Sequence, residues 1–466
     1  MTQGIAYQAG LRYLDGQLPG TPNRRLLRCR GKFYKWSGSH YQVQTDESVR
    51  NDVTRWLARN EGVRRIGDQP QPLTTSFVQN VMMAITAETA ARGDVEPGTW
   101  IDNRPMHTVG PFLSTAGGIL DLGGLNRGKP VLLKPTADFF SLTSLPHDPD
   151  ATTPSPLFHR FLTDTFGDER QVIQLIQEIF GYCLWPDCRF EAVFIWFGEA
   201  NTGKSTLAET LTSMLGSSNV SGIPLDRLGE RFALPALQGK LANIVLDTGE
   251  IDKTAEGLLK ALISGEPVPF EEKHQPLATM RLMPKHIFVT NILPRFHDTS
   301  NGTWRRLQIV RFDRVHPEGD RDLDLKTRLQ GELPGITEWA LQGLARLLLQ
   351  ARFTEVPRSR DILRRYREES NPVSLFLTGE CVRDLNGRVA RKLLYQVYKE
   401  WAADNGHSAL SSTRFHREVA AIQPQPDEPP RDGRGGDRMF VGIRLVHEAD
   451  AFRRLQVLDP GAAEAG

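Results

Sequence analysis

The stretch that decides the fold runs from Phe194 to Gly216 and reads FIWFGEANTGKSTLAETLTSMLG. Residues 198–205 fit the pattern G-x-x-x-x-G-K-[ST], which is typical of a loop that wraps nucleotide phosphates with its backbone N–H groups. The apolar run Ala192–Phe197 precedes the loop and suits a buried strand, and leucines recur afterwards at helical spacing, at Leu207, Leu211 and Leu215. Strand, glycine loop and helix in this order predict a phosphate-binding loop.

Each residue type in this loop has an expected role. Lys204 is expected to reach the β- and γ-phosphate oxygens, and the hydroxyl of Ser205 to hold Mg²⁺. ATP and Mg²⁺ are therefore the expected cofactors. A plain glycine turn before a helix is the alternative, and the flanking strand and helix disfavour it. The expected nucleotide-binding residues are Gly198, Glu199, Ala200, Asn201, Thr202, Gly203, Lys204, Ser205 and Thr206.

Composition places few limits on function. The 466 residues predict two to four domains, and 39% hydrophobic and 24% charged residues are typical of a soluble protein. No apolar run approaches the roughly 20 residues of a membrane span, and the N-terminus lacks the pattern of a secretory signal. A cytoplasmic protein without a membrane partner is expected. A net charge of +1 excludes a globally basic nucleic-acid binder but not local basic patches or a channel.

The four cysteines show neither a CxxC pair nor the spacing of a metal site. Reduced thiols are the expected state in a cytoplasm. They are Cys29, Cys183, Cys188 and Cys381.

Changes of pattern along the chain predict six segments. A hairpin with alternating aromatics is expected at Gly31–Val43, and further short strands are expected in GGILDLGG and KPVLLKPTADFFSL. Alternating strand and helix patterns predict a parallel α/β core. The expected segments are an α+β N-terminal domain (1–145), a linker and helical collar (146–189), the α/β core (190–350), a helical connector (351–372), a C-terminal domain (373–447) and a flexible tail (448–466).

The C-terminal domain is expected to be a winged helix. RVARKLLYQVYKEWAADNGH and SSTRFHREVAAI predict two helices, and DGRGGDRMFVGIRLV predicts a glycine-tipped hairpin. Winged helices bind DNA or serve as protein-contact modules, and both alternatives stay open. The arginines that could touch phosphates are Arg414 and Arg417 on the second helix and Arg431, Arg434 and Arg438 at the hairpin.

Polar residues follow the next strands of the core. Asp247 ends the apolar run Leu241–Leu246, with Glu250 close behind, and such acids hold the Mg²⁺ shell and polarise an attacking water. Asn291 ends the strand KHIFVTN, where it could orient that water. Arg305 and Arg306 precede a further strand and suit a finger that reaches the γ-phosphate of a neighbouring subunit. We expect catalytic roles for Lys204, Asp247, Glu250, Asn291, Arg305 and Arg306, and a metal-binding role for Ser205 and Asp247.

This series resembles the superfamily 3 helicases, in particular the phage and plasmid primase-helicase family that includes the poxvirus primase-helicase. GEANTGKS resembles its motif A, NIVLDTGE motif B and FVTN motif C. LLKALISGEPVPFEEKH resembles its signature segment, with Glu266 where aspartate is usual. The resemblance implies an AAA+-like P-loop core, a homohexameric ring and single-stranded DNA as partner. It also implies that Lys273 and His274 form a hairpin tip that binds DNA, where an ordinary exposed turn is the alternative.

Two departures from the family pattern matter. The second acid usually lies closer to the first, so either Asp247 or Glu250 is the residue that activates water. Many relatives carry an N-terminal primase-polymerase domain, and no comparable carboxylate cluster is evident in residues 1–145. A separate primase or polymerase is therefore a further expected partner.

The leading hypothesis is an ATP-dependent, ring-forming DNA helicase for replication of a phage, prophage or plasmid. The alternative is a P-loop ATPase that acts as a switch or transcription regulator, with the winged helix as its DNA reader. Stimulation of ATPase by single-stranded DNA favours the first, and strong binding to one duplex sequence favours the second. A small-molecule kinase is disfavoured because no acceptor-site lid is obvious.

Overall fold

The computed structural model describes residues 2–17, 26–66, 69–70, 72–93, 95–101, 111–125, 130–247, 253–271, 278–294, 296, 301–317, 319, 322, 324–407, 409–423 and 436–446. They form two compact units. The larger unit contains Met1–Pro294 and Arg306–Ser359, and the smaller contains Arg295–Arg305 and Arg360–Gly466.

A parallel five-stranded sheet forms the centre of the larger unit, in the order β12-β13-β16-β11-β17. Its inner strands are buried along most of their length, as expected for a parallel sheet with both faces covered. The predicted parallel α/β core is confirmed. The strands are β11 (Val193–Gly198), β12 (Val220–Ser221), β13 (Ala242–Leu246), β16 (Lys285–Thr290) and β17 (Leu307–Phe312).

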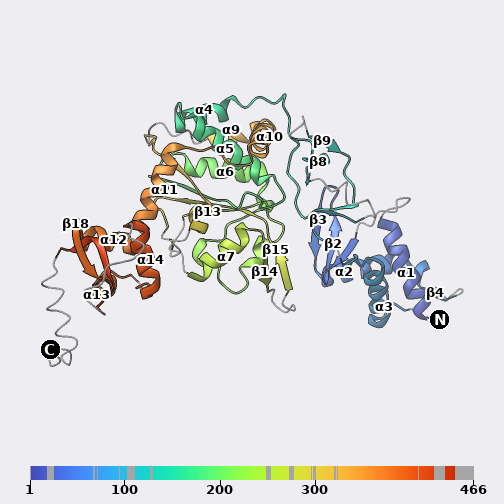
Figure 1. The fold of residues 1–466 in the computed structure, drawn as a ribbon. Helices are drawn as coiled ribbons and strands as arrows, with labels where there is room; N and C mark the ends of the chain where they lie inside the picture. Colours follow the sequence, from blue (N-terminus) through green and yellow to red (C-terminus); the bar gives the residue numbers. More distant parts are fainter. Residues whose placement is uncertain are drawn as a thin grey trace. The chain divides into compact units, whose positions relative to one another are not determined.

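Helices cover this sheet, and α5 and α10 pack closely against each other (Figure 1). One hydrophobic core joins these helices to the sheet, with Phe180, Trp196 and Leu344 fully buried. The helical pattern predicted between Leu157 and Trp185 is confirmed as α4 and α5. The helices are α4 (Pro156–Phe166), α5 (Arg170–Cys183), α6 (Lys204–Leu215), α7 (Lys253–Ile263), α9 (Leu325–Leu329) and α10 (Leu333–Gln350). Short 3-10 turns are η3 (Ser217–Asn219), η4 (Leu225–Arg227), η5 (Leu234–Leu237) and η7 (Gln330–Glu332).

The N-terminal part combines helices with small antiparallel sheets. The aromatic hairpin predicted at Gly31–Val43 is confirmed, since β2 pairs with β3 and Trp36 lies opposite Tyr41. The predicted short strands are present as β8, β9 and β10. The elements are α1 (Thr2–Gln17), β1 (Leu26–Cys29), β2 (Lys32–Trp36), β3 (Tyr41–Gln44), α2 (Asp46–Arg59), η1 (Glu61–Arg64), β4 (Arg65–Ile66), β5 (Gln69–Pro70), α3 (Thr75–Glu88), β6 (Thr99–Trp100), β7 (Phe112–Ser114), β8 (Ile119–Asp121), β9 (Val131–Leu133) and β10 (Phe139–Phe140).

The C-terminal part has its own core, in which the rings of Tyr398 and Phe415 stack 4.4 Å apart. Both predicted helices are present, as α13 and α14. The predicted hairpin is wrong in one respect: β19 pairs with β18, which precedes the helices, and Phe440 lies opposite Val389. The elements are α8 (Asn301–Trp304), α11 (Pro357–Ser370), α12 (Pro372–Glu380), β18 (Cys381–Ala390), α13 (Arg391–Asp404), α14 (Ser412–Ile422) and β19 (Met439–Leu445).

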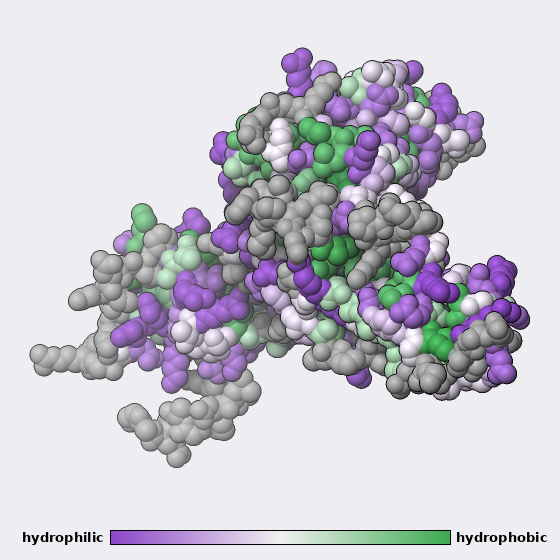
Figure 2. All heavy atoms as spheres, turned by 90° about the vertical axis from the view of Figure 1, so that its right-hand side faces the viewer, coloured by the Kyte–Doolittle hydropathy of each residue, from purple (hydrophilic) through white to green (hydrophobic). Residues whose placement is uncertain are grey.

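The surface is mixed in character. On the face drawn in Figure 2, hydrophilic side chains are interspersed with smaller hydrophobic areas. Within the described parts of the chain, every helix is too short or too polar to cross a membrane.

Candidate nucleotide site

The glycine loop joins β11 to α6, as the sequence predicted. Gly203 has a φ of +86°, in the region that favours glycine. A Cβ atom there would lie 3.1 Å from Oγ1 of Thr165 and 3.2 Å from Cε2 of Phe161, both on α4. Backbone conformation and the close approach of α4 therefore both require glycine at this position.

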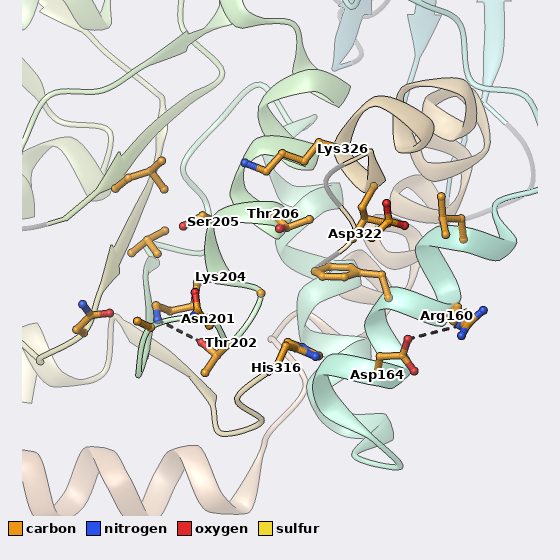
Figure 3. Close-up of a pocket in the computed structure, with 18 of the residues that line it drawn as sticks. Arg160, Asp164, Asn201, Thr202, Lys204, Ser205, Thr206, His316, Asp322 and Lys326 are labelled. Atoms are coloured by element: carbon orange, nitrogen blue, oxygen red, sulfur yellow. Dashed lines mark hydrogen bonds and ion pairs between the residues drawn. The ribbon is translucent and has the colours of Figure 1, made fainter. Parts of the chain in front are cut away.

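Lys204 is buried at the start of α6, and its Nζ atom points back into the loop (Figure 3). Nζ donates to the carbonyl oxygens of Gly198, at 2.7 Å, and Glu199, and to Oγ1 of Thr202 at 3.2 Å. Burial lowers the pKa of this ammonium group. Carbonyl dipoles are weaker partners than a phosphate, so a bound triphosphate would gain this cation as its partner.

A cavity of about 960 Å³ opens at this loop. Its volume lies at the upper end of the usual range for small-molecule sites. Lys204, Ser205, Asp247 and Asn291 all line it, so the structure brings these predicted residues together. The complete lining is Leu157, Arg160, Phe161, Asp164, Ala200, Asn201, Thr202, Gly203, Lys204, Ser205, Thr206, Leu246, Asp247, Val289, Thr290, Asn291, His316, Asp322, Leu325, Lys326 and Arg328.

The order of the strands explains why these residues meet. β16 lies between β11 and β13, so Asn291 follows a strand whose neighbours lead to the glycine loop and to Asp247. Parallel strands present their carboxyl ends at one edge of the sheet, where ligands of such folds bind. Oγ1 of Thr290 donates to the carbonyl oxygen of Ile292 at 2.6 Å, which fixes the turn that carries Asn291.

Asp247 adopts a strained conformation at the end of β13. Its φ is +75°, and its N–H donates to the carbonyl oxygen of Val289 at 2.9 Å. Aspartate tolerates this region better than most residues, and such outliers gather at functional sites. The side chain is exposed, at the rim of the cavity. Glu250, the other candidate for activating water, lies outside the described residues.

The donor set fits Mg²⁺. This ion usually takes one or two protein oxygens together with substrate phosphates and waters. The hydroxyl of Ser205 and the carboxylate of Asp247 face the same cavity and could supply those oxygens. Among the described residues, no group of three His, Cys, Asp or Glu side chains has the arrangement of a metal site.

One wall of the cavity was missed from the sequence. It comprises four residues of α4 together with His316, Asp322, Leu325, Lys326 and Arg328. Arg160 and Asp164 of α4 form an ion pair of 3.6 Å, and the N–H of His316 donates to the carbonyl oxygen of Asn201 at 2.9 Å (Figure 3). This wall is distant from the glycine loop in sequence and matches no known short motif. The sequence therefore did not indicate that these residues line the cavity.

The two predicted finger arginines differ in environment. Nη2 of Arg306 lies 2.6 Å from Oε2 of Glu191 and donates to Oγ of Ser264 at 2.9 Å, and its side chain is only 17% exposed. Arg305 is exposed and belongs to the smaller unit. Within the described part of the chain, neither arginine lines the cavity.

The segment between the second and third core strands forms an antiparallel hairpin of β14 (Pro267–Phe270) and β15 (Ala278–Arg281). The extended stretches predicted on either side of Lys273 and His274 are therefore confirmed. Those two residues lie outside the described part of the chain.

A second feature, at the end of β14 that leads to the hairpin tip, was not foreseen. Arg231 forms an ion pair with Glu271, which directly follows β14, with Nε of Arg231 3.0 Å from Oε2. Next to it, Phe232 is 46% exposed and has a φ of +72°. A bulky residue rarely adopts this conformation. The guanidinium of Arg231 lies 5.1 Å from the centre of the Phe232 ring.

Of the arginines predicted to touch phosphates in the C-terminal domain, Arg417 and Arg438 are exposed and Arg414 is half-buried. Arg431 and Arg434 lie outside the described residues. The structure places Arg414 and Arg417 on α14, as predicted.

Comparison with known proteins gives matches to different parts of the chain. Residues 196–306 match a family of unknown function (DUF5906), and residues 368–428 match the Poxvirus D5 protein-like family. "Putative helicase 121R" of Invertebrate iridescent virus 3 is 25% identical over 166 residues, which are 33% of this chain and 18% of that protein. "Putative helicase 184R" of Invertebrate iridescent virus 6 is 23% identical over 213 residues, 41% of this chain and 21% of that protein.

The matched segments span about a fifth of these viral relatives. Among solved structures, an apo form of the NrS-1 C-terminal region is 14% identical to this chain, with a TM-score of 0.47. The alignment covers 90% of this chain and 96% of the NrS-1 chain. The matches to the poxvirus family and the viral proteins confirm the predicted resemblance to the phage and viral primase-helicase type.

Proposed function

We propose that this chain, a relative of phage and viral primase-helicases, is the ATPase motor of a ring-forming DNA helicase. One observation carries the proposal: Lys204, Ser205, Asp247 and Asn291 line a single cavity at the carboxyl edge of a parallel sheet. These are the residue types that bind a triphosphate, its metal ion and an attacking water. The curated relatives are named as helicases, which agrees with this use of the site.

Hydrolysis would be divided among these residues as follows. Lys204 neutralises charge on the β- and γ-phosphate oxygens, which grows in the transition state. Ser205 and Asp247 would hold Mg²⁺, which when bound would supply further positive charge beside the phosphates. Asp247 or Glu250 accepts a hydrogen bond from the attacking water, and the Asn291 amide orients it.

Assembly into a homohexamer would complete the site. Neither of the two predicted finger arginines is among the described residues that line the cavity, whereas Arg305 is exposed elsewhere on the chain. Because the Arg306 side chain is only 17% exposed whereas Arg305 is exposed, Arg305 is the residue that we assign to the neighbouring subunit's γ-phosphate. Such an arginine typically raises the rate by about 10³–10⁵-fold.

Single-stranded DNA would bind at the hairpin of β14 and β15. Lys273 and His274 at its tip supply donors for phosphates. The exposed ring of Phe232 lies beside Arg231, which binds Glu271 at the tip end of β14. An exposed aromatic ring next to cations suits base stacking without sequence preference. If ATP hydrolysis moves the hairpin, the bound DNA strand would move with it.

The C-terminal part would act as a winged helix. Its order of α12, β18, α13, α14 and β19, with β18 paired to β19, supports this assignment. Exposed Arg417 on α14 is suited to a phosphate contact, while a protein contact remains the alternative use of such domains. Replication of a phage, prophage or plasmid, with primers from a separate primase or polymerase, is the corresponding biological role.

The test is an ATPase assay with and without single-stranded DNA, run beside a native mass measurement. The proposal expects stimulation by any single-stranded sequence and a mass of six chains. A chain that hydrolyses ATP without stimulation, yet binds one duplex sequence strongly, would instead be the ATPase switch or transcription regulator.

A further inference from the structure

Arg305 and Arg306 are neighbours in sequence but belong to different compact units. The boundary falls between them, because Arg295–Arg305 group with Arg360–Gly466 and the larger unit resumes at Arg306. The turn that carries Arg305 therefore belongs with the C-terminal part of the chain.

Arg306 is fixed to the larger unit by both its backbone and its side chain. Its carbonyl oxygen accepts from the N–H of Val193, the first residue of β11, at 2.9 Å. Its guanidinium is bound by Glu191 at 2.6 Å and by Ser264 at 2.9 Å. Arg306 is thus anchored to the central sheet.

The residues before Arg305 are fixed to α11 by packed aromatic rings. Trp304 is 3% exposed, and its ring lies edge-on against Tyr366 of α11, with 5.1 Å between centroids and 76° between planes. Phe296 completes the cluster, with its ring centre 6.4 Å from each of the other two. Edge-to-face pairs of buried rings are among the stronger apolar contacts.

α11 continues almost directly into the C-terminal core. Oδ1 of Asn371 caps α12 by accepting from the N–H of Val373 at 3.0 Å, and Val373 is fully buried in that core. A continuous series of packed elements therefore joins the C-terminal core to the turn that carries Arg305.

We infer that Trp304 and Tyr366 are positioning residues for Arg305, so that the C-terminal unit sets the location of this arginine. The inference rests on the proposed function, in which Arg305 enters a neighbouring subunit's site. It makes the C-terminal part, through α11, the element that fixes where this arginine lies. Contiguous packing of this kind is a physical route for coupling between sites.

Full-length chains with Tyr366→Ala and Tyr366→Leu test the inference, with Tyr366→Phe as the matched control. A finger arginine acts mainly in the transition state, so its displacement lowers kcat and leaves KM nearly unchanged. Because a displacement of 1 Å can cost about 100-fold, we expect kcat to fall at least about tenfold for the Ala and Leu chains. The Phe chain keeps the ring and should retain wild-type kcat. Native mass should be unchanged in all three.

Mixing experiments distinguish positioning from general damage. A Tyr366→Ala chain has an intact cavity but a misplaced arginine, whereas a Lys204→Ala chain has the reverse defect. Mixed assemblies should therefore regain hydrolysis at interfaces where the intact cavity of a Tyr366→Ala chain meets the correctly placed Arg305 of a Lys204→Ala chain. Damage to the chain's own cavity would not be complemented.

Three results would overturn the inference: unchanged kcat in the Ala and Leu chains, a change in KM alone, or failed complementation despite co-assembly. A wild-type chain without ATPase activity overturns the proposed function and the inference with it. An active wild type with an unaffected Tyr366→Ala chain overturns the inference alone.

Discussion

The Nζ atom of Lys204 lies 2.7 Å from the carbonyl oxygen of Gly198, so the lysine joins the two ends of its own loop. A further donation to Thr202 at 3.2 Å holds the middle of the loop. The loop thus positions its cation before any substrate arrives. Preorganised charge of this kind stabilises a transition state without reorganisation during the reaction.

Lys204→Ala should abolish ATP hydrolysis while the fold survives. Removing one such electrostatic contact typically lowers kcat by about 10²–10³-fold. Lys240→Ala is the matched control, because this lysine also donates to a backbone carbonyl, that of Ser218, and burial also lowers its pKa, yet it lies outside the cavity lining. ATPase assays with circular dichroism as a fold check decide the matter. Turnover of the Lys204→Ala chain within roughly tenfold of wild type would refute the site.

Arg305→Ala and Arg306→Ala should fail in different ways. An Arg305→Ala chain mixed with a Lys204→Ala chain should regain some hydrolysis, because an intact cavity then meets an intact arginine across one interface. Arg306→Ala removes the contacts with Glu191 and Ser264 and should lower the free energy of unfolding by about 1–3 kcal/mol. Chemical denaturation measures the second effect. Complementation of the Arg306 chain with wild-type stability would reverse our assignment of the two residues.

The parts of the fold and of the nucleotide site that could be predicted from the sequence are those fixed by local residue patterns. The loop from Gly198 to Ser205 has a required residue at almost every position, and the strand before it and helix after it have clear periodicities. Parallel topology then follows from alternating strands and helices, and it brings Asp247 and Asn291 to the same edge as the loop. Asp247, Asn291 and the glycine loop lie close together because the carboxyl ends of their strands lie at the same edge of the sheet. The residue types alone would not have placed them there.

Contacts between distant segments were not predictable. The pairing of β18 with β19 joins strands on either side of two helices, and a nearby glycine-rich turn favoured a local hairpin. The α4 wall of the cavity is recognisable only once Phe161 is seen against Gly203. The contact of Arg306 with Glu191 joins residues that are 115 positions apart in the sequence. In each case the deciding partner has no sequence signal of its own.

His286 should make the larger unit sensitive to acid. Its ring is 1% exposed on β16, and burial, aided by Lys285, lowers its pKa to about 3. Because the folded state binds this proton less readily than the unfolded state, stability is complete above the ordinary pKa of about 6.5 and falls as pH drops toward the folded value. At pH 5.5 the loss from this group is on the order of 1 kcal/mol.

His286→Phe should remove that part of the pH dependence. Asn243 keeps its bonds to Ser221 and Ile223 in such a chain, so the strand should tolerate the change. Thermal midpoints at pH 7.5 and 5.5 should differ less for the variant than for the wild type. Equal differences in the two proteins would show that another group causes the acid loss.

Lys273→Ala/His274→Ala should separate hydrolysis from DNA engagement. Basal ATPase and assembly are expected to persist, since neither residue belongs to the described cavity lining. Stimulation by DNA and strand separation should be lost, and the affinity for DNA should depend less steeply on salt because fewer phosphates are neutralised. Normal unwinding by this chain would exclude the tip as the DNA-binding element.

Phe232 offers a test in which stability and DNA engagement move in opposite directions. A φ of +72° is unfavourable for phenylalanine, whereas asparagine tolerates it, and 46% of the Phe232 residue is already exposed. Phe232→Asn should therefore keep or slightly raise the thermal midpoint of the chain. It should also lose the ring that stacks on bases, so DNA stimulation of ATPase should fall and DNA binding should weaken by about 1–3 kcal/mol. Phe232→Trp keeps a π face at the same position and should retain DNA binding. If the Asn chain binds and responds to DNA like the wild type, the ring has no role in stacking and its strained conformation needs another explanation.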